Sequence, residues 1–270
     1  MKKKKMFLRA SLITIACAAL TLIGSCSNIT IAFATETTNA TQDIEATTSV
    51  TDHVTIKDNT SKKIIKNKKG KKIGVYKFHK PVLEGNTAAI LTINNFYKEQ
   101  RIAQIKLFKA DAIQTISEFQ EENNIVVTDE LTYEVTYNKN GYLCILQSGY
   151  IYTGGAHGMP YRIAHTFDLN TGKEVLLKDV FQLTEKEMTL TIARAFNKMF
   201  KSDTESTYWD DALKTVKKTA NFSSPFYLTD KGVCFYYSPY DLACYARGFV
   251  EATLHYSSNK DIIKLPALAE

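Results

Sequence analysis

The stretch "LTYEVTYNKNGYLCIL", residues 131–146, constrains the fold more than any other part of the chain. Its first half alternates large apolar residues with threonine and glutamate, which is typical of a strand with two unlike faces. Asn140-Gly141 follows, and both residue types accept the positive φ angles of a two-residue hairpin turn. The next segment, Tyr142–Tyr152, is apolar on both faces at its start, as in a central strand. These residues therefore predict an antiparallel sheet.

Further patterns place helices and strands on either side of this hairpin. Tyr76 and Phe78 alternate with polar residues in a strand that Pro81 is expected to end. Apolar residues spaced three or four apart predict a long helix over 88–122, and Thr184 with Glu187 forms a capping box before another helix. A shorter helix is expected around residues 209–216. Two more hairpins are expected at 170–172 and 230–232, with a last strand at 249–256. This order predicts an α+β fold: a mainly antiparallel sheet with one long N-terminal helix and one or two further helices packed on it.

The N-terminus resembles an export signal. Lys2–Lys5 precede the apolar stretch "LITIACAALTLIG", and small residues follow. "IGSC" resembles a lipobox, which favours a lipoprotein signal over residues 1–26 with lipidation at Cys26. Cleavage after Ala34 is the alternative, and an uncleaved anchor is a third reading. We expect an extracytoplasmic protein, held at the membrane through its lipid or signal, with free secretion as the alternative.

Residues 27–70 are expected to form a flexible tether, polar at first and then rich in lysine. Seven lysines lie in "KKIIKNKKGKK", residues 62–72, which suits anionic wall polymers, lipid headgroups or plain solvation. We place an N-terminal subdomain at 71–140, a C-terminal subdomain at 141–258 and a tail at 259–270.

The charge distribution argues against a nucleic-acid partner. The chain carries a formal net charge of +6, but five basic residues lie in its first nine positions and seven in the lysine run. The remainder holds 22 basic and 28 acidic residues, or −6, so a folded part without the lysine run would be acidic. Beyond the signal region three cysteines remain, which is not a disulfide framework. They are expected to be buried hydrophobes, and a Cys144–Cys234 bridge stays open.

The stretch "YTGGAHG", Tyr152–Gly158, is the strongest candidate site. Catalysis by His157 needs a nucleophile or an orienting carboxylate, and a metal site needs further ligands at a recognisable spacing, which the sequence lacks. We therefore expect no catalytic residue, no metal and no cofactor, and interpret the glycines as a sharp turn that lets a partner approach the backbone. The candidate binding loop comprises Tyr152, Gly154, Gly155, Ala156, His157 and Gly158.

The segment "YIYTGGAHGMPYRIAHTFDLNTGKEVLLKDVF", residues 150–181, resembles the signature of a secreted bacterial family, domain of unknown function 3298. The later "FYYSPYDLACYARG", residues 235–248, is similar to its second hallmark, with Asp241 and Cys244 in place of the usual glutamate and proline. The region from about Ile73 to Tyr142 looks like the family's usual companion, domain of unknown function 4163.

The resemblance implies an extracytoplasmic recognition module. Similar modules form the outer part of an anti-sigma factor that senses lysozyme, and they precede the catalytic domain of a peptidoglycan deacetylase. We expect a non-catalytic, cell-envelope binding module that recognises a cell-wall component or a wall-attacking protein such as lysozyme. A hydrolase that uses His157 with a carboxylate such as Asp168, and a structural envelope protein, are the alternatives. The candidate aromatic surface comprises Tyr150, Tyr161, Tyr240 and Tyr245.

Overall fold

The structure is a computed structural model of the chain, and it describes residues 52–119, 125–205 and 207–265. These residues belong to one compact unit, Thr48–Glu270. The predictions for the signal peptide, for Cys26, for the tether up to residue 51 and for the end of the C-terminal tail lie outside the described residues. Within the described residues, every helix is too short or too polar to cross a bilayer.

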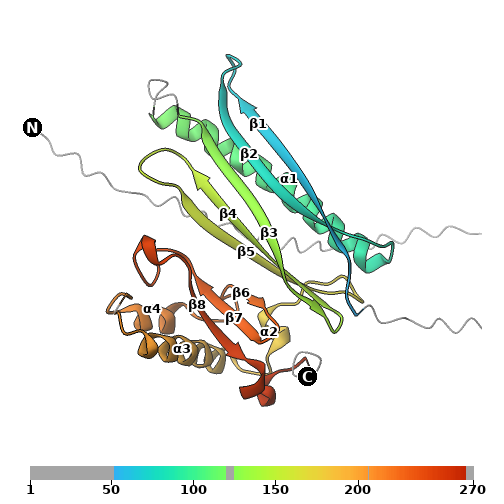
Figure 1. The fold of residues 1–270 in the computed structure, drawn as a ribbon, viewed down its shortest axis with the longest axis vertical. Coiled ribbons are helices and arrows are strands. Elements are labelled where there is room, and N and C mark those ends of the chain that lie inside the picture. The colour runs from blue at the N-terminus through green and yellow to red at the C-terminus, as the bar shows by residue number, and fades with distance from the viewer. Residues whose placement is uncertain (1–51, 120–124, 206, 266–270) are drawn as a thin grey trace, which may run out of the picture. The chain divides into compact units, whose positions relative to one another are not determined.

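The first sheet has five strands in the order β1-β2-β3-β4-β5. Its strands are β1 (Ile56–Lys66), β2 (Lys72–Leu83), β3 (Val127–Lys139), β4 (Tyr142–Tyr152) and β5 (Met159–Asp168). Neighbours are antiparallel except β2 and β3, which run parallel from Gly74↔Val127 to Phe78↔Leu131. A parallel pair needs a crossover connection, and the long helix α1 (Ala88–Phe119) supplies it along one face of the sheet (Figure 1).

The helix α1 packs on the sheet because β2 makes room for it. A β-carbon on Gly74 would lie 3.1 Å from the Phe108 ring and 3.2 Å from Ala112, so glycine permits a close approach of strand and helix. The helix begins at Ala88, where the Ile90 amide donates to the Thr87 hydroxyl at 3.2 Å. Two buried clusters lie between α1 and the sheet. The opposite face of β1–β3 carries no helix among the described elements (Figure 1).

The second sheet has three antiparallel strands in the order β6-β7-β8. They are β6 (Phe226–Leu228), β7 (Gly232–Tyr237) and β8 (Val250–His255), preceded by the helices α2 (Leu177–Val180), α3 (Glu185–Ser202) and α4 (Ala212–Thr219). Short 3₁₀ turns follow at η2 (Tyr245–Arg247), η3 (Tyr256–Ser258) and η4 (Lys260–Ile262). The predicted capping box of α3 is present, with the Thr184 hydroxyl accepting from the Glu187 amide at 3.3 Å.

The two sheets share a core and a polar bridge. Tyr137 and Cys144 of the first sheet belong to the cluster formed by α3, α4 and the second sheet. Arg162 of β5 pairs with Glu251 of β8 at 2.5 Å, and its guanidinium lies 4.3 Å from the Phe249 ring centroid. Because these groups pack across the two sheets, the described residues form one folded body.

The predicted α+β class with a mainly antiparallel sheet and a long helix is confirmed. The prediction of a flexible tether was wrong over residues 56–70, because residues 56–66 form β1, which pairs with β2 along its length. Pro81 does not end β2, which continues to Leu83 opposite Ile56. The expected boundary at 140/141 falls on a hairpin inside the first sheet, so it does not separate subdomains.

Two smaller expectations also change. The hairpin at 170–172 is a tight turn closed by a single bridge, Phe167↔Glu174, because α2 begins at Leu177 and leaves no room for a second strand. The thiols of Cys144, Cys234 and Cys244 are free in the structure. Cys144 and Cys234 are buried as expected, and the Cys144 sulfur accepts from the Leu228 amide at 3.3 Å. Cys244 is exposed, contrary to expectation, because it lies in the turn before η2.

Candidate functional site

The glycine-rich loop connects β4 to β5 and turns on backbone angles that only glycine adopts easily. Gly154 and Gly155 have φ angles of +105° and +90°. At Gly158 the constraint is space, since a β-carbon would lie 2.5 Å from the Ile151 carbonyl oxygen. The predicted sharp turn is therefore present, and all three glycines are required for its shape.

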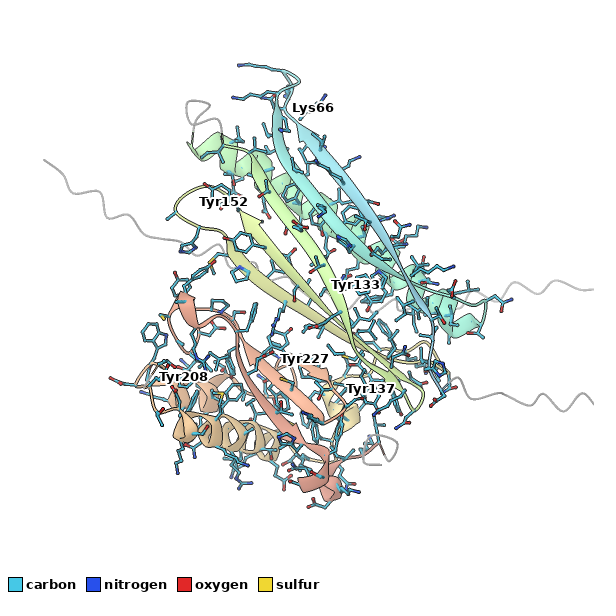
Figure 2. The ribbon with its side chains drawn as sticks, viewed as in Figure 1. Lys66, Tyr133, Tyr137, Tyr152, Tyr208 and Tyr227 are labelled. Atoms are coloured by element: carbon cyan, nitrogen blue, oxygen red, sulfur yellow. The ribbon has the colours of Figure 1, made fainter. Side chains whose placement is uncertain are left out.

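Three tyrosine hydroxyls tie this loop down. Tyr150 accepts from the Gly158 amide at 2.9 Å, and Tyr245 donates to the Gly158 carbonyl oxygen at 2.9 Å. Tyr152, labelled in Figure 2, donates to the Gly155 carbonyl oxygen at 3.0 Å. Tyr245 comes from η2, so the loop is held by a residue 87 positions later in the sequence. A loop fixed in this way is pre-organised, which reduces the entropy lost on binding a partner.

His157 is exposed at the tip of this loop. Its Nδ1 donates to the Gly158 carbonyl oxygen at 2.9 Å, and its ring stacks on Tyr245 with centroids 4.1 Å apart and an interplanar angle of 27°. Its contacts in the structure are thus a backbone carbonyl and an aromatic ring. The imidazole closes the turn and extends the aromatic surface.

The stacked pair continues into a wider set of exposed aromatic side chains. Tyr240 lies 5.6 Å from Tyr245, and the Trp209 indole donates to the Tyr240 carbonyl oxygen at 3.4 Å. Tyr150, Trp209 and Tyr240 are 45%, 44% and 50% exposed, respectively. We call this set the aromatic patch. It comprises Tyr150, His157, Trp209, Tyr240 and Tyr245.

Backbone strain accompanies the patch. Tyr240 has a φ of +75°, and the other non-glycine residue with positive φ in the described part of the chain is Asn140 of the hairpin turn. Positive φ costs a bulky residue on the order of 1–3 kcal/mol, and such strain concentrates at functional sites. The turn that holds Tyr240 is closed by the Ser238 amide donating to the Asp241 carboxylate at 2.9 Å.

Three of the four predicted surface tyrosines come together in the patch, and Tyr161 does not. Its hydroxyl donates to both carboxylate oxygens of Asp129 at 3.1 and 2.9 Å, beneath α1. A β-carbon on Gly149 would lie 2.1 Å from the Tyr161 ring, so that ring fills the space left by the glycine. Burial raises the pKa of Asp129 to about 6, the Tyr161 hydrogen bond opposes the rise, and Asp111 adds to it. Tyr161 is therefore half-buried and packs against the core, and the prediction that it belongs to the aromatic surface was wrong.

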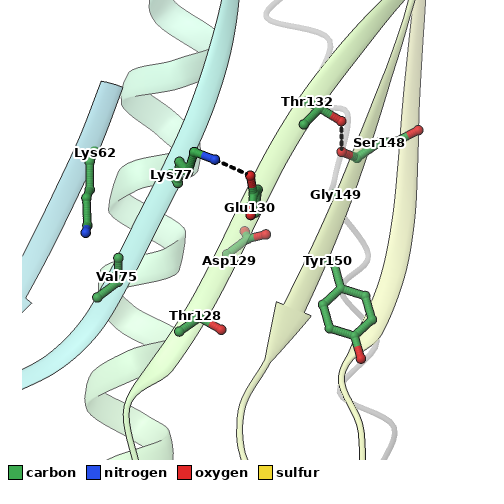
Figure 3. A pocket seen from close by; sticks show the side chains of 10 residues that line it. All are labelled: Lys62, Val75, Lys77, Thr128, Asp129, Glu130, Thr132, Ser148, Gly149 and Tyr150. Carbon is green, nitrogen blue, oxygen red and sulfur yellow. Dashed lines mark hydrogen bonds and ion pairs between the residues drawn. The ribbon is translucent and has the colours of Figure 1, made fainter. Parts of the chain in front are cut away.

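A hollow of about 580 Å³ lies on the sheet face opposite α1, beside Tyr150 (Figure 3). Lys62 and Lys77 line one side, and Lys77 pairs with Glu130 at 2.6 Å. The remaining lining is rich in hydroxyl groups, from Thr128, Thr132, Ser148 and Tyr150. Hydrogen-bond donors and acceptors that lie next to an aromatic ring suit a polar ligand such as a sugar.

The other predicted partners of His157 lie elsewhere. Asp168 is at the opposite end of β5, about 30 Å along a ten-residue strand, where it accepts from the Asn170 amide at 2.8 Å. His165 is buried, donates to Glu174 at 2.5 Å and accepts from Gln100 at 2.9 Å. The arrangement therefore does not bring together the histidines and the carboxylate that catalysis was expected to need.

His79 has both a carboxylate and a hydroxyl group within hydrogen-bonding distance of its ring. Asp58 and Thr60 both contact its Nδ1, at 2.7 and 3.1 Å. A catalytic relay needs the carboxylate on one ring nitrogen and the hydroxyl on the other, so this cluster lacks the relay geometry. In the part of the chain that the structure describes, no three His, Cys, Asp or Glu side chains gather in a way that could hold a metal ion.

Sequence reasoning missed two residues of these sites. Trp209 is the single tryptophan of the chain, and it was expected in a short helix around residues 209–216 that in fact begins at Ala212. Asp129 shares one face of β3 with the buried Val127 and Leu131, and a charged residue in that inward register position was the available signal.

The fold and the aromatic loop define a two-part α+β module, and family comparisons agree with this description. Residues 65–160 match the family described as Deacetylase PdaC, and residues 177–257 match the Protein of unknown function (DUF3298). The predicted family resemblance is thereby confirmed, and the PdaC match lies where the companion segment was expected. The glycine-rich loop falls inside the PdaC segment rather than in the DUF3298 segment. No curated protein matches the chain.

Two crystal structures of DUF3298 family proteins share the fold. The first, from Bacteroides fragilis, is 16% identical with a TM-score of 0.59. The second, from Pseudomonas aeruginosa, is 18% identical with a TM-score of 0.55. Each comparison covers 82% of this chain and 98% of the other. These structures show the shared fold, and the family matches indicate an envelope-associated module of unknown function.

Proposed function

We propose that this chain is an exported, non-catalytic binding module that recognises a glycan of the cell wall through the aromatic patch. The observation that carries the proposal is the stacked His157–Tyr245 pair at the tip of a loop fixed by three tyrosine hydroxyls. Sugar rings present flat faces of C–H groups, which pack on exposed aromatic rings. A patch whose rings are already fixed loses little entropy when it binds.

The hollow beside Tyr150 supports a polar ligand. Tyr150 belongs both to the patch and to the lining of the hollow, so a glycan stacked on the patch can extend toward the hydroxyl groups of Thr128 and Ser148. Such convergent polar groups next to an aromatic platform supply orientation as well as affinity. The strain at Tyr240 also fits a site kept for binding, since it costs stability without filling the core.

An acidic folded part would attract a basic protein partner such as lysozyme, but the predicted acidic charge is not present. That prediction assumed that the lysine run lies outside the fold, but β1 and β2 contain most of it. The unit Thr48–Glu270 holds 29 basic and 25 acidic residues, a net charge of +4 instead of −6. A positively charged unit is not steered toward a basic protein, so the wall glycan is the better-supported partner.

The test is binding of soluble, uncross-linked peptidoglycan strands to the purified chain, measured by Trp209 fluorescence and by calorimetry. We expect saturable binding, and a loss of roughly tenfold in affinity on truncating one central ring, as in Tyr245→Ala or His157→Ala. Leu107→Ala, which removes an exposed side chain of α1 (53% exposed), is the matched control and should bind normally. Binding that is equal in all four proteins would overturn the assignment of the patch.

The same samples separate a binding module from a hydrolase. New reducing ends or released acetate in the wild-type reaction, abolished by His157→Ala, would establish the enzymatic alternative. We expect the strands to be recovered unchanged.

A further inference from the structure

The β1–β2 hairpin is a strongly basic ribbon. Between Asn59 and Leu83 the chain holds nine lysines and no acidic residue. These lysines are Lys62, Lys63, Lys66, Lys68, Lys69, Lys71, Lys72, Lys77 and Lys80. All except Lys80 are exposed. The unit's positive charge is thus concentrated on one element.

The ribbon places like charges directly opposite each other. Lys62 faces Lys77 and Lys66 faces Lys72 in the register of the two strands. Like charges directly opposite each other in an antiparallel pair destabilise that pair. Glu130 offsets part of this cost at Lys77. Since stable folding does not require opposed lysines, they point to an anionic ligand that would remove the repulsion.

The tip of the ribbon is ordered for contact. Pairing of β2 with β3 begins at Gly74, so among the described strands Lys72 of β2 pairs with β1 alone. The Asn67 side chain fixes the turn by accepting from the Lys69 and Lys71 amides at 3.0 and 2.9 Å. Lys66 lies near this end in Figure 2. A fixed turn presents its lysines to a partner without a further ordering cost.

The lysines of the ribbon form a basic track that leads from its tip to the hollow on the sheet face opposite α1. Lys62 and Lys77 line that hollow together with the hydroxyl-bearing Thr128 and Thr132 (Figure 3). A membrane is a plane, and it can touch the protruding tip but not the floor of a hollow. A thin, flexible polymer reaches both. The continuity of charge and hydroxyl groups therefore favours a polymer with repeated anions and polar links.

We propose that the ribbon binds a polyanionic phosphodiester polymer, with phosphates along the lysines and polyol or sugar units in the hollow. Lysine ammonium groups bind phosphate oxygens as point charges. Each neutralised phosphate releases condensed counterions, so affinity falls with salt. This surface shares the hollow and Tyr150 with the glycan site, but the lysines carry the proposal, so it does not depend on glycan stacking on His157 and Tyr245.

The test uses the full chain and poly(glycerol phosphate) as the probe, with affinity measured over a range of salt concentrations. Lys66→Gln/Lys68→Gln/Lys69→Gln should weaken binding by roughly tenfold or more and flatten the dependence on salt. Lys62→Gln tests the track toward the hollow and should weaken binding less. The matched control removes the same charge from exposed positions of α4, as Lys214→Gln/Lys217→Gln/Lys218→Gln, and should change affinity little. Lys2–Lys5 are present in every variant, so they do not affect the differences.

Two further arms define the ligand and separate the two proposals. Polyglutamate of equal charge should bind more weakly if phosphate and polyol contribute, and phosphatidylglycerol vesicles should bind more weakly than the polymer. Preference for vesicles, or equal losses in the ribbon and α4 variants, would overturn the proposal. Tyr245→Ala should retain full polymer affinity, so failure of glycan binding at the patch leaves this outcome unaffected.

Discussion

Replacing Asp129 with asparagine should make the protein more stable at neutral pH, although it removes a hydrogen-bonded carboxylate. Burial raises the pKa of Asp129 from 3.8 to about 6, because the charged form loses water beneath α1. A shift of roughly two units corresponds to about 3 kcal/mol. Because the pKa of Asp129 is higher in the folded than in the unfolded state, this group adds most to the free energy of unfolding at low pH. That stabilisation is lost as the pH rises from about 4 through about 6.

Asparagine stays neutral throughout this range and still accepts one hydrogen bond from Tyr161. The Tyr161 hydroxyl shares its single proton between the two carboxylate oxygens, and losing one of these contacts costs about 1 kcal/mol. We therefore expect Asp129→Asn to be less stable than the wild type by up to about 1 kcal/mol near pH 4 and to exceed its free energy of unfolding by about 2 kcal/mol at pH 7.

The assay is urea unfolding followed by Trp209 fluorescence at pH 4, 5, 6 and 7. Glu130→Gln is the matched control, since it neutralises the exposed neighbour in β3 and breaks the ion pair with Lys77. That variant should change stability by less than about 1 kcal/mol at every pH. If Asp129→Asn were less stable than the wild type at pH 7, or kept the wild-type slope between pH 4 and 6, the carboxylate would be stabilising when ionised and our reasoning would be refuted.

Three other substitutions test the packing, the loop strain and the bridge between the sheets. Gly149→Ala should lower thermal stability strongly, by 2 kcal/mol or more in roughly the range of an overpacked core, because its β-carbon would meet the Tyr161 ring; an unchanged melting temperature would contradict this. Tyr240→Gly should raise stability by about 1 kcal/mol through relief of positive φ. It should also weaken glycan binding, and calorimetry can measure both the stability and the glycan affinity. Arg162→Met should leave the Glu251 carboxylate with the Tyr227 hydroxyl as its hydrogen-bond donor and no cation, at a cost of about 1–3 kcal/mol that chemical denaturation measures. A neutral effect would mean that the ion pair contributes nothing net.

The sequence predicted those elements whose signals are local. Thr184 with Glu187 fixes the start of α3, and Asn140-Gly141 fixes the β3–β4 turn. The start of the long helix at Ala88 was also correct, since a capping threonine precedes it. In each case the residues that specify the element lie within a few positions of it, so periodicity and turn chemistry were sufficient.

Elements that depend on distant partners were missed. β1 looked like a tether because its lysines and threonines bury little, and its pairing depends on β2. The parallel pairing of β2 with β3 follows from the path of α1, which composition does not reveal. Within the site, Tyr245 joins the loop from 87 residues away, and the burial of Tyr161 follows from its neighbour Gly149. Such contacts are set by tertiary packing rather than by local pattern.

The position of β1 at the outer edge of its sheet also bears on solubility. An edge strand offers unpaired backbone groups to any other chain that can add a strand, and lysines along that edge discourage such addition. A shortened chain that began at Lys72 would expose β2 instead, along a stretch that includes Ile73, Val75 and Tyr76. We would expect that shortened protein to self-associate, whereas one that keeps the residues from Thr48 onward should stay dispersed.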